Sequence, residues 1–422
     1  MRSRPSPALL LALTVFALAL GLRSHNGAEP YDDLYHAKRI AWSAAHFPHV
    51  LELDPDRGTV EAFCPWPPLY DLAGGLVARV FGMRAVEWSP PLLFSLFAVL
   101  LAWWTCRRAG ATAGAIAGIG VALSPYLIPI SSIGAIDHHW AEPVLVLLIA
   151  AATLWGSPLA LAVAMIAALF VQSALIVAAG LAFVAVFFVL DRPRAGAIAF
   201  ALTAAAVAAY RLTRLPHFPD SPWFLGWTHV TLLAAAAIAC ALATFGARRS
   251  VALAAGALVL VPLLPPLFAG ARFFAGDPWL RTIVEFQAMF SDRAAIGTDL
   301  ANLTGGAALA LLLALGIARR GIKRTPAVAV LLLFALAYLA LALSSRRFLV
   351  IGIPLFILCG ALAAQRARTT LLTAIFAAIT LLPPVAYDLY AAALPESDGH
   401  ADIVFRIAKA VKPLPPGRVL AG

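Results

Sequence analysis

The chain has 422 residues, of which 62% are hydrophobic and only 12% are charged, and its mean hydropathy is +0.89. An ordinary soluble domain carries about 25% charged residues, so the composition excludes that class and indicates a polytopic protein of the lipid bilayer. The formal net charge is +10, but the basic residues lie mainly between apolar segments rather than in one patch, which argues against a nucleic-acid partner.

Apolar segments follow one another along almost the whole chain, and they predict an all-α polytopic membrane protein with about 13 transmembrane helices. Several segments are shorter than the ~20 residues that span a bilayer unaided. The first could also be a cleaved signal peptide, because MRSR gives it a basic start, although no convincing small-x-small cleavage site follows. The segments lie at 8–22, 88–106, 111–129, 141–155, 158–172, 174–190, 195–210, 224–245, 251–269, 300–318, 326–343, 348–364 and 370–387.

Short basic connections between these segments set the predicted orientation. CRRAG, DRPRAG, GARRS, ARRGIKR and AQRARTT all fall on the same side of the membrane as the N-terminal MRSR. By the positive-inside rule this side is the cytoplasm, which predicts an inner (plasma) membrane protein with its long loops on the periplasmic or extracellular face. These outer regions are residues 23–87, 211–223 and 270–299, and a tail from 388 to 422.

Ionisable residues gather at two outer places in this arrangement. Asp32 and Asp33 follow the first segment, and DHHWAE at 137–142 places four ionisable residues at the end of a span. A charged group near the centre of a lipid-facing helix costs about 2.5 to 3.5 kcal/mol, and less near the surface. Residues 137–142 therefore form either a polar collar that ends a helix or, if helical, one cluster of carboxylates and imidazoles.

The shared outer location of these acids favours the cluster. Two carboxylate regions with imidazoles nearby suit a hard divalent cation such as Mg²⁺ or Mn²⁺. A third acid, Glu285, interrupts an apolar stretch of the outer loop 270–299. Taken alone, Glu285 is an ordinary exposed loop acid.

Several of these stretches resemble motifs of oligosaccharyltransferase catalytic subunits. DDLYHAKR is similar to the first-loop acidic motif of that family, GAIDHHWAE to its second acidic motif, and TIVE to its Thr-Ile-x-Glu motif. SSRRFLVIGIP resembles an Arg-Phe segment at the start of a late span, and PWPPLYDLAGG resembles the end of the first external loop. The order and spacing of the motifs agree over nearly the whole chain.

The resemblance implies a GT-C type membrane glycosyltransferase, with 1–387 as its transmembrane catalytic domain. Such an enzyme moves a glycan from a polyprenyl-linked phosphate or diphosphate donor to an acceptor protein or peptide, with protein Asn as the expected acceptor. Carried over to this chain, the catalytic residues are Asp32, Asp137 and Glu285. These three residues and His139 are the expected metal ligands, with Mg²⁺ or Mn²⁺ as the cofactor.

The same resemblance suggests residues that contact substrates. They are Tyr35, His36, His138 and Arg347, of which His138 could also support the metal. Glu142 is expected to give polar support at the end of its helix.

The chain departs from the family at its C-terminal end. Family members continue into a soluble outer domain whose Trp-Trp-Asp-Tyr-Gly motif reads the acceptor sequon, whereas no such motif occurs here. Residues 388–422 are therefore expected to form only a short outer tail. A separate protein could supply the domain, the enzyme could use another acceptor, or the gene product could be incomplete.

Two other function classes stay open at this stage. A GT-C relative that moves a single sugar from a polyprenyl phosphate to lipid or protein would need the outer acids but no sequon-reading domain. A non-catalytic membrane transporter or scaffold would explain the many spans, yet it would not call for separated acids on one face.

Single-cysteine labelling tests the predicted orientation. In a background without the four natural cysteines, a membrane-impermeant thiol reagent added outside intact cells should label a cysteine placed within 388–422 or 270–299. A cysteine within 319–324 should react only after the cells are opened, because the Arg and Lys residues there are expected to hold that loop in the cytoplasm. Labelling of 319–324 in intact cells would overturn the orientation.

Overall fold

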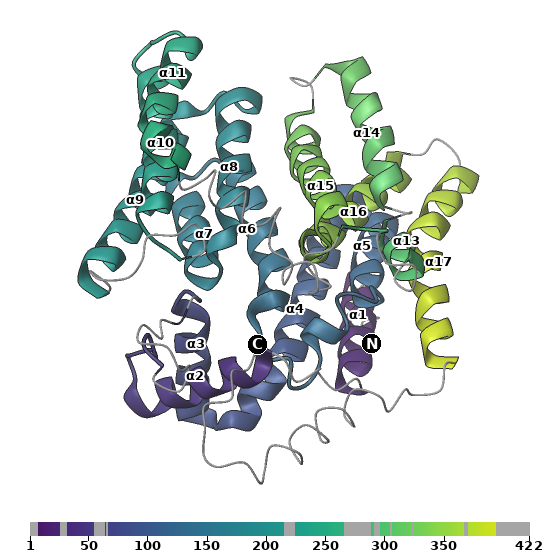
Figure 1. Ribbon diagram of the computed structural model, residues 1–422. Helices are drawn as coiled ribbons and strands as arrows, with labels where there is room; N and C mark the ends of the chain where they lie inside the picture. Colours follow the sequence, from purple (N-terminus) through teal and green to yellow (C-terminus); the bar gives the residue numbers. More distant parts are fainter. Residues whose placement is uncertain are drawn as a thin grey trace, which may run out of the picture.

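The protein is described here from a computed structural model (Figure 1), and the ranges it describes contain helices and no β-strand. The described residues are 7–25, 32–54, 64, 66–214, 224–265, 288–290, 296–303, 306–321, 325–366 and 370–393.

The helices follow one another through the chain with short connections. They are α1 (Pro7–His25), α2 (Asp32–His46), α3 (Leu69–Phe81), α4 (Met83–Ala109), α5 (Ala111–Ala122), η2 (Pro129–Ser131), η3 (His138–Trp140), α6 (Ala141–Trp155), α7 (Pro158–Val171), η4 (Ser173–Leu175), α8 (Ile176–Val184), η5 (Ala185–Val189), α9 (Pro193–Arg214), α10 (Trp227–Thr244), α11 (Arg249–Leu260), η6 (Val261–Leu263), α13 (Ile296–Leu303), α14 (Gly306–Arg320), α15 (Pro326–Ser344), α16 (Arg347–Arg366) and α17 (Thr370–Ala393).

Every expected apolar segment contains a helix, so the all-α prediction is confirmed, but the expected count of about 13 spans is not. In the described part of the chain, six helical stretches are long and apolar enough to cross a membrane. Several other apolar helices are shorter, as the sequence indicated. The six long stretches are Met83–Ala109, Pro193–Thr213, Trp227–Thr244, Asp299–Arg320, Pro326–Ser344 and Arg347–Arg366.

Helix boundaries differ from the expected segments at several places. The expected outer loop 23–87 contains two helices of its own, α2 and α3. α5 ends at Ala122 rather than near 129, because Pro125 and Pro129 follow and disfavour helical backbone. Residues 296–299 of the expected loop 270–299 already belong to α13, and α17 continues beyond 388 to Ala393.

The helices form two groups that lie side by side (Figure 1). In one group, α9 packs against α7 and α10, and α10 packs against α11. In the other, α16 packs against α5, α14, α15 and α17, while α4 packs against α1 and α5. α6 contacts α15 and α16 and so joins the groups. α2 packs on α3, which contacts α4 and α7, and these two helices lie at the lower edge of the view in Figure 1.

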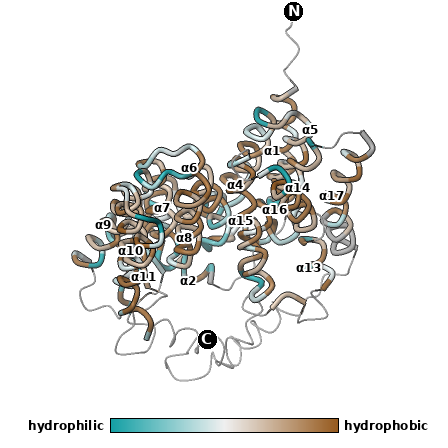
Figure 2. The backbone as a smooth tube through the Cα atoms, turned by 90° about the horizontal axis from the view of Figure 1, so that it is seen from above, coloured by the Kyte–Doolittle hydropathy of each residue, from teal (hydrophilic) through white to brown (hydrophobic). Residues whose placement is uncertain are grey.

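Hydrophobic residues make up most of the helices (Figure 2), and small residues allow the helices to approach closely. At Gly114 of α5, an added Cβ would lie 2.6 Å from the Cβ of Cys106 and 2.7 Å from the carbonyl oxygen of Ala102, both in α4. α5 is therefore held tightly against α4, and the loop that follows α5 starts from a fixed point.

A buried arginine then fixes that loop. The Arg23 guanidinium at the end of α1 donates to the carbonyl of Ala122 at 3.0 Å and to the hydroxyl of Ser131 at 2.6 Å. The backbone N–H of Gly134 donates to the carbonyl of Glu87 in α4 at 3.1 Å. Since these bonds tie the loop to α1, α4 and α5, the residues just after Gly134 have a defined position.

Candidate functional site

Asp137 lies where this loop meets the first two helices of the outer region. Its backbone N–H donates to Oδ1 of Asp33 in α2 at 2.8 Å, and its carbonyl accepts from the hydroxyl of Tyr70 in α3 at 2.9 Å. Its own carboxylate caps η3 by accepting from the backbone N–H of His138 at 2.5 Å. The carboxylate therefore has a fixed position relative to α2, α3 and η3.

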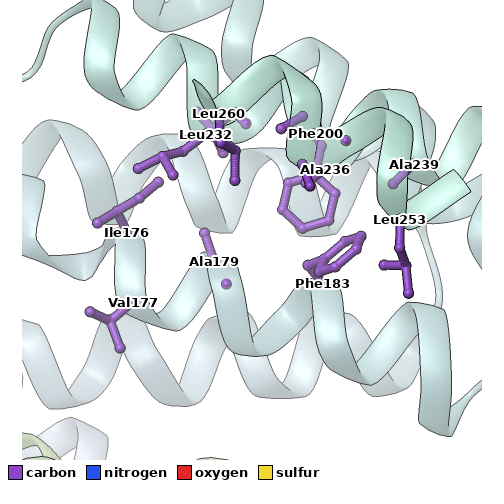
Figure 3. Close-up of a pocket in the computed structure, with 15 residues that line it drawn as sticks. Ile176, Val177, Ala179, Phe183, Phe200, Leu232, Ala236, Ala239, Leu253 and Leu260 are labelled. Carbon is purple, nitrogen blue, oxygen red and sulfur yellow. The ribbon is translucent and has the colours of Figure 1, made fainter. Parts of the chain in front are cut away.

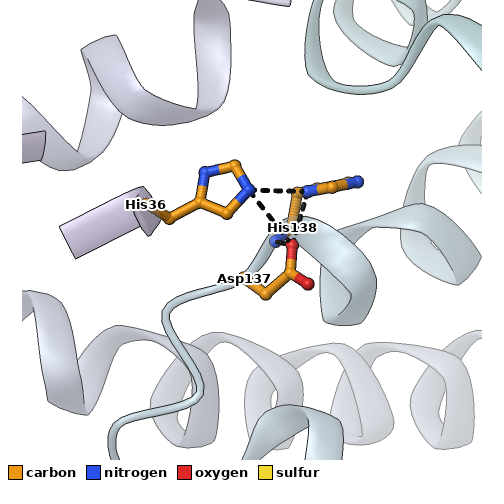
Figure 4. Close-up of side chains that lie close together, drawn as sticks. All are labelled: His36, Asp137 and His138. Atoms are coloured by element: carbon orange, nitrogen blue, oxygen red, sulfur yellow. Dashed lines mark hydrogen bonds and ion pairs between the residues drawn. The ribbon is translucent and has the colours of Figure 1, made fainter. Parts of the chain in front are cut away.

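Two histidines lie against this carboxylate (Figure 4). Nε2 of His36 lies 3.4 Å from Oδ1 of Asp137 and 3.3 Å from Nδ1 of His138. Nδ1 of His138 lies 2.5 Å from the same Asp137 oxygen. Each of the three residues offers one ligand atom, and these atoms lie within 4.8 Å of one another. Ligands on bonds of about 2.0 to 2.1 Å around a tetrahedral cation are roughly 3.3 Å apart, which matches the two separations from Nε2 of His36, whereas Nδ1 of His138 lies closer to Oδ1 of Asp137.

A second group of donors continues from the first. His139 bridges two acids, with Nε2 at 3.0 Å from Oδ2 of Asp137 and Nδ1 at 3.2 Å from Oε1 of Glu142. Nε2 of His138 lies 3.2 Å from the same Glu142 oxygen. The polar cluster that the sequence allowed for 137–142 thus exists, although Asp137 caps a 3₁₀ turn instead of lying in a continuous helix with Glu142.

The local electrostatics favour positive charge within the cluster. Burial, together with the charge of Asp137, raises the pKa of Asp33 to about 6. Burial also opposes ionisation of Asp137, but His139, His138 and His36 outweigh it and hold the pKa of this carboxyl well below its usual range. Burial would lower the pKa of His138, yet its contact with Asp137 raises it. A bound cation would also stabilise the ionised carboxylates of the cluster.

The structure describes the side chains of only some of the predicted metal ligands. Asp137 and His139 are in contact, as described above. Asp32 is the first residue of α2, but its side chain lies outside the described residues, and so does the whole of Glu285. Among the described side chains of the first outer region, the carboxylate bonded to the Asp137 backbone is that of Asp33.

The predicted substrate-contact residues lie at different positions relative to the cluster. His36 and His138 are both 1% exposed and belong to the cluster itself. Nη2 of Arg347 lies 3.3 Å from Oε1 of Glu142, at the edge of the cluster. Tyr35 faces elsewhere, because its hydroxyl lies 2.9 Å from Sγ of Cys64.

Sequence reasoning missed two residues that contact the histidines. Asp71 of α3 lies 2.7 Å from Nδ1 of His36 and is fully buried. Gln172, before η4, has its amide nitrogen 2.7 Å from Nε2 of His138. The sequence does contain a signal for Asp71, because an acid in the apolar stretch LYDLAGG needs a partner if it is buried. No comparable signal marked Gln172, since its partner is distant in sequence.

A second buried polar group lies at the start of α16. The Arg346 guanidinium donates to the Asp299 carboxylate through Nε at 3.2 Å and through Nη2 at 3.1 Å. The same carboxylate accepts from the hydroxyl of Tyr126 at 3.2 Å and from the backbone N–H of Phe290 at 2.9 Å. Asp299 therefore joins α13 to α16 and to the chain just after the expected Thr-Ile-x-Glu motif.

Comparison with known proteins identifies the architecture. No protein-family model and no curated protein matches the chain. The archaeal oligosaccharyltransferase AglB from Archaeoglobus fulgidus, solved with an inhibitory peptide and a dolichol-phosphate, matches with a TM-score of 0.72 over 96% of this chain and 54% of that one, at 18% identity. This chain has the fold of an archaeal oligosaccharyltransferase. The resemblance stated from the motifs is thereby confirmed at the level of fold.

Two further solved structures of the Archaeoglobus fulgidus oligosaccharyltransferase agree. One, tethered to an acceptor peptide that contains the NVT sequon, matches with a TM-score of 0.69 and 18% identity over 90% of this chain and 55% of that one. The other, a complex with Zn and sulfate, matches with a TM-score of 0.64 and 17% identity over 90% of this chain and 51% of that one. The chain thus spans about half the length of these proteins.

The buried pair of Asp299 and Arg346 is expected to stabilise the protein more than the exposed pair of Asp191 and Arg249 does. Asp299→Asn should lower the free energy of unfolding by about 3 to 5 kcal/mol, because it removes the buried carboxylate charge that pairs with the Arg346 guanidinium. Asp191→Asn, in an exposed pair with Arg249, should change it by less than about 1 kcal/mol. Thermal unfolding of both variants in detergent measures the difference. Equal stability of the two variants would show that the Asp299 pair does not hold α13 and α16 together.

Proposed function

We propose that this chain transfers a glycan from a polyprenyl-phosphate- or diphosphate-linked donor to an acceptor on the outer face of the membrane, with protein Asn as the acceptor. The observation that carries the proposal is a buried cluster of one carboxylate and two imidazoles, His36, Asp137 and His138, in a chain with the fold of an oligosaccharyltransferase. A non-catalytic scaffold gives no reason for such a cluster.

The donor set supports a divalent cation as cofactor. Between Mg²⁺ and Mn²⁺, the imidazoles favour Mn²⁺, because Mg²⁺ prefers oxygen ligands. Asp137, His36 and His138 would hold the cation, and Glu142 lies 3.2 Å from Nε2 of His138 on the other side of that ring. A related protein has been solved with Zn, which supports binding of a metal by this fold. When bound, the cation supplies positive charge that stabilises a departing lipid phosphate.

Residues around the cluster can bind and orient the two substrates. Arg347 is 19% exposed in its pair with Glu142, so its guanidinium can also bind a phosphate of the donor. Glu285, from the outer loop, is proposed to accept a hydrogen bond from the acceptor amide and so orient its nitrogen. Asp32 is proposed as a further ligand of the cation from the start of α2.

An apolar pocket supports a lipid-linked donor (Figure 3). Its volume is about 510 Å³, and it lies between α8, α9, α10 and α11, with Ile176, Phe183 and Phe200 among its lining side chains. α8 begins just after the turn in which Gln172 contacts His138. A hydrocarbon chain whose phosphate lies at the cluster can therefore extend along α8 into the pocket. The related protein solved with a dolichol-phosphate agrees with this kind of donor.

Reconstituted transfer tests the proposed activity. The purified chain with a polyprenyl-diphosphate-linked glycan, an Asn-x-Thr peptide and Mn²⁺ should give a glycopeptide detectable by mass spectrometry. Chelation of the metal, or Asp137→Asn, should lower the rate by about 10²-fold or more, since each removes several kcal/mol of charge stabilisation. Asp191→Asn should transfer normally. Undiminished transfer by Asp137→Asn would contradict the proposal, and sugar transfer to lipid alone would favour the single-sugar alternative.

Filling the pocket tests the donor lipid separately. Gly180 lines the pocket, and nothing lies within 4 Å of a Cβ added there, so Gly180→Leu should fold. It should raise KM for a long-chain donor about tenfold, because two displaced methylene groups are worth about 0.8 kcal/mol each. Gly316→Leu in α14, where the added Cβ is equally free, is the matched control. The same KM in both variants would place the lipid elsewhere.

A further inference from the structure

We propose that Asp71, held by Arg39, is a positioning residue that orients His36 so that Nε2 binds the divalent cation. The inference rests on the proposed function, because it deepens the cation site on which that function depends. It adds to the site a carboxylate and a guanidinium that the sequence motifs do not assign.

The contact between Asp71 and His36 fixes the histidine tautomer. Oδ1 of Asp71 lies 2.7 Å from Nδ1 of His36, and the side chains are 0% and 1% exposed. An ionised carboxylate only accepts, so Nδ1 carries the hydrogen, and in the neutral imidazole Nε2 then presents its lone pair. That lone pair faces Oδ1 of Asp137 at 3.4 Å. A cation bound between these two acceptors would be held by both, at a place where Nδ1 of His138 also lies, 3.3 Å from Nε2 of His36.

Arg39 supplies the opposite charge that a buried carboxylate requires. Its Nη1 lies 2.5 Å from Oδ2 of Asp71. The guanidinium also donates to the carbonyl of Leu51 at 3.3 Å and to that of Trp66 at 3.2 Å. These bonds hold the guanidinium in one place, so the second oxygen of Asp71 is occupied and the first is directed to His36.

The packing of α2 on α3 brings these groups together. His36 and Arg39 are one turn apart on α2, and Asp71, Gly74 and Gly75 lie on one face of α3. A Cβ added at Gly75 would lie 2.6 Å from the Cβ of Ser43 in α2, and one added at Gly74 would lie 2.7 Å from Cδ1 of Ile40. At Gly75 a side chain would push α2 away, so glycine permits this approach, which places Asp71 within hydrogen-bond reach of His36.

This carboxylate–histidine arrangement is a known way to orient a metal ligand. The partner carboxylate fixes the tautomer and makes the imidazole a stronger ligand, and its loss typically costs about 10- to 100-fold in metal affinity. Asp71→Asn should therefore raise the Kd for Mn²⁺ by about 10- to 100-fold, although Asp71 is not itself a ligand.

Binding of Mn²⁺ alone, measured by electron paramagnetic resonance on the full chain in detergent, tests the inference. His36→Gln should weaken binding at least as much as Asp71→Asn, and the double variant should bind no more weakly than His36→Gln alone, because Asp71 acts through His36. Asp71→Glu keeps the charge beside Arg39 and should weaken binding several-fold while retaining the fold. Additive losses in the double variant, or an unchanged Kd in Asp71→Glu and Asp71→Asn, would overturn the proposal.

A matched control separates orientation from the general loss of a buried acid. Asp54 is 1% exposed and accepts from Lys38 at 2.8 Å, so it resembles Asp71 in burial and pairing. Asp54→Asn should bind Mn²⁺ within about twofold of the unchanged chain. Since no donor or acceptor is present, a chain that binds Mn²⁺ in this pattern but transfers no glycan would contradict the proposed function alone.

Discussion

The hydrogen bond from the backbone N–H of Asp137 to the carboxylate of Asp33 joins two segments on which the whole candidate site depends. Asp33 and His36 lie one turn apart on α2, so the bond that fixes α2 beside η3 also brings His36 to the Asp137 carboxylate. The loop before Asp137 is fixed in turn by the buried Arg23. Buried backbone and charged groups in an apolar bundle must find partners within the protein, and here those partners define the geometry of the site.

The sequence predicted those parts of the molecule that depend on local pattern. Apolar runs located the helices, and DHHWAE located a polar cluster, because each signal lies within one short stretch. The number of spans did not follow, because an apolar segment can be longer than the helix within it. α5, for example, ends before the prolines of its apolar segment. Asp71 and Gln172 were missed because each has a role only through a histidine on another element, 35 and 34 residues away. Asp299 was expected in an outer loop, and only the fold places it against Arg346.

The start of α16 connects the two buried polar groups. Arg346 and Arg347 are adjacent, yet the first pairs with Asp299 of α13 and the second with Glu142 of α6. Successive residues of a helix point about 100° apart, so one helix end can hold two acids that lie on different sides of it. The two arginines of SSRRF thus each pair with a different acid. This arrangement also ties the candidate cation site to α13, whose Asp299 holds the chain near the outer-loop motif.

The charge balance among the described side chains of the candidate site favours a divalent cation over a monovalent one. The described carboxylates of the cluster and its direct partners outnumber the guanidinium groups beside them by two. In a medium of low polarity, this excess must be balanced locally, because distant counter-ions are excluded. Among the described side chains, a doubly charged ion offsets this excess better than a monovalent ion does. The groups concerned are Asp33, Asp71, Asp137 and Glu142, with Arg39 and Arg347.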